Sequence, residues 1–77
     1  MGKKYSLKGY YIGLYDRRGL HLIEVYPKAF QSRVEAKETL SELKWDYPPE
    51  EGTRYEIRPL EKDFQSSKYL RSHITLW

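Results

Sequence analysis

The sequence contains no cysteine, only two histidines and no long apolar run. Without cysteine the chain can form neither a disulfide, nor a thiolate nucleophile, nor a cysteine-zinc site. A membrane-spanning helix needs about 20 predominantly apolar residues, so none is expected and no membrane partner is predicted. The first residues carry lysines and no apolar core, so we expect no secretory signal and predict a cytoplasmic protein.

Catalytic groups are also sparse. His21 and His73 lie far apart, and neither has a nucleophile at a recognisable spacing. Ser32 is better explained as a helix cap. Glu38 and Glu42 are four residues apart on a predicted helix, which is typical of a solvated surface. We therefore expect no enzyme, no cofactor, no metal site and no small-molecule substrate.

Aromatic residues are plentiful, with eight Tyr, two Trp and two Phe among 77 residues. A single domain of this size is near the lower limit for folding alone. Aromatic side chains bring the largest contact areas and are the expected source of core packing. A second copy of the chain would add buried surface, so a homodimer is one expected partner.

A β-hairpin is predicted near the start of the chain. Residues 9–15 and 20–26 are rich in β-prone side chains, and Asp16-Arg17-Arg18-Gly19 lies between them. Asp at the first position and Gly at the fourth fit a type I turn, after which Gly takes the left-handed conformation. The register stays open, because a slip by one residue exchanges the two faces. Ile12 and Leu14 are expected to share a face with one of two sets, either Leu20 and Leu22, or His21, Ile23 and Val25.

A helix is predicted over about 33–45. Ser32 followed by Glu35 forms a capping box, in which each side chain satisfies a free backbone N–H. The core stripe of the helix is predicted to be Ala36, Leu40 and Leu43. Trp45 lies almost opposite this stripe, where it either folds under the following loop or stays exposed as a contact residue.

A third strand is predicted over 53–60. Tyr55 and Ile57 alternate with the charged Arg54, Glu56 and Arg58, which is typical of a half-buried strand. The sequence does not decide the structure of residues 61–77. Residues 69–77 either add a short fourth strand or form a tail that becomes ordered on a partner. The predicted fold is α+β, with the elements in the chain order β-β-α-β. The strands are expected to form an antiparallel sheet with one helix packed on one face.

Charge divides the chain into three parts that point to nucleic acid as one partner. Residues 1–21, which begin with a basic arm over 1–8, sum to +4; residues 22–52 sum to −3 and residues 53–77 to +2. Basic groups beside tyrosines favour binding to phosphates and bases. The candidate nucleic-acid-binding residues are Lys3, Lys4, Lys8, Tyr11, Tyr15, Arg17, Arg18, Arg54 and Arg58.

The first half of the chain resembles the arm-type DNA-binding domains of tyrosine recombinases. The shared pattern is a strand, a turn with Gly and a second strand, followed by Phe-x-Ser-x-x-Glu-Ala at the start of a helix. The matching residues are 11–19, 30–36 and Leu40, within about residues 10–43. In that family a three-stranded sheet enters the major groove and a helix braces it. The resemblance implies DNA contacts from Tyr11, Tyr15, Arg17 and Arg18. The third strand predicted here follows the helix, whereas in the family it precedes the helix.

Protein binding is the alternative function, and the one we favour from sequence. The sheet face opposite the helix is rich in Tyr, Leu and Val in either register, and an uncovered apolar face usually meets a partner. Such a chain suits an accessory or inhibitor protein encoded by a phage or other mobile element. The candidate protein-binding residues are Tyr11, Tyr15, Tyr26, Trp45 and Trp77.

Overall fold

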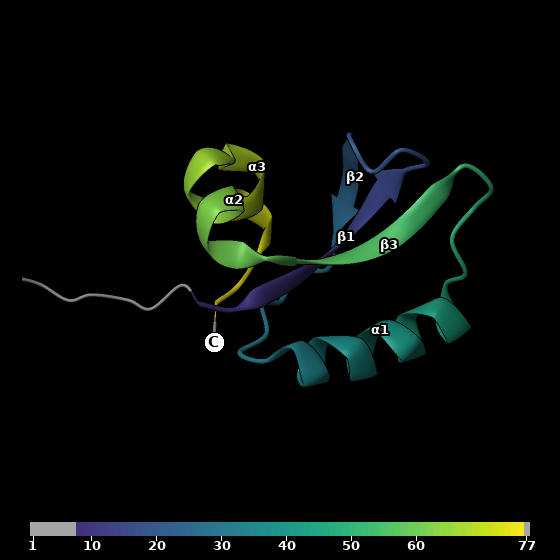
Figure 1. Ribbon diagram of the computed structural model, residues 1–77, viewed down its shortest axis with the longest axis horizontal. Coiled ribbons are helices and arrows are strands. Elements are labelled where there is room, and N and C mark those ends of the chain that lie inside the picture. Colours follow the sequence, from purple (N-terminus) through teal and green to yellow (C-terminus); the bar gives the residue numbers. More distant parts are fainter. Residues whose placement is uncertain (1–7, 77) are drawn as a thin grey trace, which may run out of the picture.

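A computed structural model of the chain describes residues 8–76. The elements are β1 (Tyr10–Asp16), β2 (Leu22–Val25), α1 (Arg33–Asp46), β3 (Thr53–Pro59), α2 (Leu60–Ser66) and α3 (Lys68–His73). The three strands form an antiparallel sheet in the order β2-β1-β3. The α+β class is therefore confirmed. Figure 1 shows α1 on one side of the sheet, and α2 with α3 on the other.

The hairpin turn forms as its residues predict. The Gly19 N–H donates to the Asp16 carbonyl over 2.9 Å, which closes the turn. Gly19 takes a φ of 73°, in the left-handed region. A Cβ added there would lie 2.7 Å from an Arg54 nitrogen and 2.8 Å from a Glu56 oxygen. The backbone conformation therefore favours glycine at this position, while a Cβ would displace only the ends of the Arg54 and Glu56 side chains.

Neither predicted register of the hairpin is correct. Leu22 pairs with Tyr15 and Val25 with Gly13, so both lie on the face opposite Ile12 and Leu14. The reason is an irregularity between Leu14 and Tyr15, where β2 contains one residue more than β1. Such a bulge changes the face on which the following side chains lie. The extra residue of β2 is Ile23.

The first hydrophobic core lies between the sheet and α1. Its buried residues are Ile12, Phe30 and Ala36, with Leu40, Leu43, Tyr55 and Ile57 packed around them. The helix begins after Ser32, whose Oγ accepts a hydrogen bond from the Glu35 N–H over 3.2 Å. The cap by Ser32 and the core stripe of the helix are thus confirmed, whereas the described residues show no return bond from the Ser32 N–H to the Glu35 side chain.

A second core lies on the other face of the sheet and was not predicted. Its buried residues are Tyr11, Ala29, Leu60, Leu70 and Ile74. Ser67 caps α3 by accepting a hydrogen bond from the Leu70 N–H. Two short helices therefore follow β3 over residues 60–73, and residues 61–76 form no fourth strand. Thr75 contributes a single parallel bridge to Lys28. The face expected to lie open to a partner is largely interior.

We predict that Leu60→Ala destabilises the protein by about 2–5 kcal/mol, because Leu60 is fully buried in the second core. Leu20→Ala is the matched control, since Leu20 is 67% exposed and should change stability by less than about 0.5 kcal/mol. Urea unfolding followed by circular dichroism measures both. Equal effects of the two substitutions would contradict the packing of α2 on the sheet.

Candidate functional site

The predicted basic residues separate into three groups. Lys3 and Lys4 lie outside the described residues. Lys8 is exposed before β1, and Arg17 and Arg18 are exposed in the hairpin turn. A seven-residue strand spans about 23 Å, so Lys8 and the turn lie at opposite ends of β1. These residues do not form one continuous basic surface.

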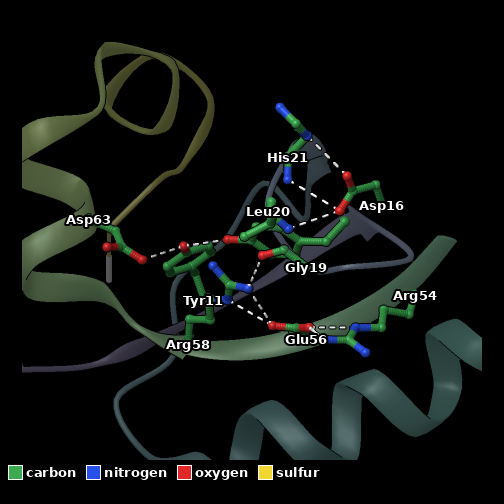
Figure 2. Close-up of polar contacts among 10 residues, drawn as sticks. Tyr11, Asp16, Gly19, Leu20, His21, Arg54, Glu56, Arg58 and Asp63 are labelled. Carbon is green, nitrogen blue, oxygen red and sulfur yellow. Dashed lines mark hydrogen bonds and ion pairs between the residues drawn. The ribbon is translucent and has the colours of Figure 1, made fainter.

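The third group, Arg54 and Arg58, forms a charged cluster around Glu56 (Figure 2). The guanidinium of each arginine lies 2.6 Å from one Glu56 carboxylate oxygen. Arg58 also donates to the Gly19 carbonyl over 2.7 Å. Its guanidinium lies 3.7 Å from the centre of the Tyr15 ring. These contacts fasten β3 to the hairpin turn, and they occupy two arginines predicted to meet phosphates.

The Glu56 carboxyl is stabilised in its charged form. Partial burial opposes ionisation, but hydrogen bonds from Arg58 and Arg54 outweigh it and lower the pKa of Glu56. Desolvation likewise opposes the charge on Arg58, and the bond to Glu56 overcomes it, so the pKa of Arg58 is raised. Both groups therefore stay charged at neutral pH.

Two tyrosines predicted as contact residues are buried. Tyr11 is 1% exposed and Tyr15 is 3% exposed, so the expectation that they lie on an open surface is wrong. Their hydroxyls are 2.7 Å apart, and the Tyr11 hydroxyl donates to Asp63 of α2 over 2.6 Å. Burial is the main cause of a raised pKa at both, and the bond to Asp63 raises the pKa of Tyr11 further. The physical reason for the correction is α2, which covers this face.

The remaining predicted aromatic residues lie elsewhere. Tyr26 is half-buried and stacks on Phe30, with ring centres 5.8 Å apart. Trp45 is 87% exposed, so the alternative in which it folds under the loop is wrong. Trp77 lies outside the described residues.

An apolar groove of about 800 Å³ lies on the α1 side of the sheet. It exists because α1 packs chiefly against β1 and β3 and leaves the β2 side less covered. One wall of the groove is formed by the sheet residues Ile12, Leu14, Ile23 and Tyr55. The other wall is formed by α1 and the loop after it, through Leu43, Tyr47, Pro48 and Pro49. Ile23 is 46% exposed and Tyr47 69% exposed, so apolar surface is open to solvent here.

Hydrogen bonds hold the loop wall of the groove in place. The Tyr55 hydroxyl donates to the Tyr47 carbonyl over 2.8 Å, which ties the loop to β3. The Tyr47 N–H donates to the Leu43 carbonyl over 2.6 Å and ends α1. Thr53 bonds to the Glu50 carbonyl through both its N–H and its hydroxyl. The groove is therefore formed before any ligand arrives.

The charge of the groove is opposite to that of the chain. Its fifteen lining residues include Glu24, Asp46 and Glu50 but no Lys, Arg or His, although the chain as a whole carries +3. None of these three carboxylates forms an ion pair within residues 8–76. Burial raises the pKa of Tyr55, and the charge of Glu24 raises it further.

Sequence reasoning did not find this groove, although one of its signals was present. The sequence places the acidic part of the chain at residues 22–52 and predicts a loop after the helix. That the loop returns to β3 and stands beside β2 depends on contacts between distant residues. Of the predicted protein-binding residues, Tyr26 lines the groove.

Within residues 8–76, no group of three or more His, Asp or Glu side chains is arranged to hold a metal ion. Over the same residues, no helix is both long and apolar enough to cross a membrane. Comparisons with protein-family models, curated proteins and solved structures find no match to this chain. The resemblance to recombinase arm domains therefore stays a prediction.

We predict that Tyr11→Phe lowers the free energy of unfolding by about 1–3 kcal/mol, because it removes a hydrogen bond to a charged partner. Since the folded pKa of Tyr11 is raised, its contribution is present below about pH 10 and is lost as the pH rises further. Above that pH, the free energy of unfolding of the variant should fall less steeply with rising pH than that of the wild type. Urea unfolding across this range measures both effects, with Tyr10→Phe as the control. An effect of Tyr10→Phe equal to that of Tyr11→Phe would count against the buried bond.

We predict that Glu56→Gln destabilises the protein at neutral pH and that the difference from wild type narrows in acid. The folded pKa of Glu56 is lowered, so its contribution is present above the unfolded value of about 4.3 and is lost as the pH falls through the folded value. Unfolding titrations at neutral and acid pH measure this difference. Glu38→Gln, on the exposed side of α1, is the control. A difference that stays constant with pH would contradict the ion pairs.

Proposed function

We propose that the chain is a small, non-enzymatic protein-binding module whose contact surface is the groove beside β2. The observation that carries the proposal is a preformed apolar groove whose Ile23 and Tyr47 side chains are exposed. Burying an apolar side chain completely is worth about 1.5–3 kcal/mol, and the part of Ile23 and Tyr47 that is still exposed would contribute a corresponding share to association. Because hydrogen bonds already hold the loop wall, little ordering is needed on binding.

Trp45 is proposed as a further contact residue, on the outer side of α1 rather than in the groove. It is the most exposed large apolar side chain in the described part of the molecule and lies almost opposite the stripe of α1 that packs on the sheet. Tryptophan is among the residue types that contribute most to protein interfaces. A module of this kind suits an accessory or inhibitor protein.

Nucleic-acid binding is supported less well. Arg54 and Arg58 are engaged with Glu56, while Tyr11 and Tyr15 are buried. The exposed basic groups Lys8, Arg17 and Arg18 lie at opposite ends of β1. The groove itself is lined by carboxylates, which repel phosphate.

Selection from a phage-displayed library of random peptides tests the groove as the contact surface. We expect enriched peptides to bind the wild type and to bind Ile23→Ser with Tyr47→Ala roughly tenfold or more weakly, because apolar contact area is lost. Fluorescence polarisation of the synthesised peptides gives the affinities.

The matched control is Val34→Ser with Tyr69→Ala, which removes one aliphatic and one tyrosine side chain outside the groove. This control should bind like the wild type. If the selection enriches no peptide, or if the groove and control variants bind the peptides equally, the proposed function is wrong.

A further inference from the structure

The tip of the hairpin has the opposite character to the groove. Arg17 and Arg18 are exposed and form no ion pair within residues 8–76. Leu20 follows them and is 67% exposed. The tip therefore presents one apolar side chain and two positively charged ones, next to the Asp16 carboxylate. The groove is an apolar recess lined by the negative charges of Glu24, Asp46 and Glu50.

The tip is also held in one shape. The Asp16 carboxylate accepts hydrogen bonds from the Leu20 N–H over 2.9 Å and the His21 N–H over 3.3 Å. It also lies 3.0 Å from a His21 ring nitrogen. The hydrogen bonds from His21 and Leu20 hold the pKa of Asp16 well below its usual range. Arg58 bonds to the Gly19 carbonyl from the opposite side. A projection and a recess that are both preformed lose little conformational freedom on meeting.

We propose that the groove of one copy of this chain receives the hairpin tip of a second copy. This inference rests on the proposed function and names the occupant of the same groove. Leu20 would bury its side chain against the groove lining, while Arg17 and Arg18 meet the carboxylates Glu24 and Asp46. Because the tip and the groove are different surfaces, each copy both gives and receives a contact. A contact built on one short turn buries less than the roughly 1,200 Å² of a stable interface, so the association is weak and concentration-dependent.

Sedimentation analysis over a concentration series tests the proposal with the intact chain. We expect the average mass of the wild type to rise with concentration at about 0.1 M salt. It should return to that of the monomer at about 1 M salt, where the Debye length falls to about 3 Å. A wild type that stays monomeric at every concentration overturns the inference.

Charge reversal makes the test specific. The tip variant is Arg17→Glu with Arg18→Glu, and the groove variant is Glu24→Lys with Asp46→Lys. Each variant alone should associate roughly tenfold more weakly than the wild type. All four side chains are exposed, so the variants should fold, which circular dichroism checks. A 1:1 mixture should associate again, because the unchanged tip of the groove variant meets the unchanged groove of the tip variant. The acidic tip of the tip variant also matches the basic groove of the groove variant. Failure of the mixture to associate overturns the inference.

The control is Lys37→Glu with Lys44→Glu, which makes the same change in net charge as the tip variant at exposed positions of α1. It should associate like the wild type; if it weakens association as much as the tip variant, the cause is net charge and the inference is wrong. The two proposals fail separately. A monomeric wild type whose selected peptides still depend on Ile23 and Tyr47 rejects the second copy as occupant and leaves the protein-binding function standing.

Discussion

The central strand β1 needs cover on both of its faces, and the rest of the chain is arranged to provide it. Tyr11 and Tyr15 lie on one face and Ile12 on the other, and all three are almost fully buried. A strand buried on both faces requires a layer on each side of the sheet. Helix α1 supplies one layer, while α2 and α3 supply the other. The bond from Tyr11 to Asp63 joins the second layer to the strand that it covers.

This arrangement covers the two edge strands unequally. Helix α1 lies over β1 and β3, so the apolar side chains beside β2 stay partly exposed to solvent. The loop after α1 then returns to β3, where the hydroxyl of Tyr55 holds the carbonyl of Tyr47. The groove is therefore a consequence of how one helix of 14 residues covers a three-stranded sheet. Its acidic lining comes from the part of the chain that forms β2, the end of α1 and the loop.

The features that the sequence predicts correctly are those set by neighbouring residues. The turn at Gly19, the cap at Ser32 and the alternation of Tyr55 with charged residues depend on spacings of four residues or fewer. The hairpin register was not predictable in this way, because the extra residue in β2 carries no turn signal of its own. The short helices α2 and α3 were missed because each is stabilised by contacts of one or two apolar residues with the sheet.

The candidate site shows the same division between what is local and what is not. Alternation along β3 correctly places Arg54, Glu56 and Arg58 on one face. It does not show that Glu56 forms ion pairs with both arginines, nor that α2 covers the adjoining tyrosines.

The net charge of +3 conceals a local contrast, because among the described residues unpaired positive charges lie at the hairpin tip and unpaired negative charges line the groove. At physiological salt the repulsion between two net-positive copies is screened beyond about 8 Å. In the proposed association, the pairing of opposite charges outweighs this repulsion at contact distance, and the charge pattern orients the tip of one copy toward the groove of the other.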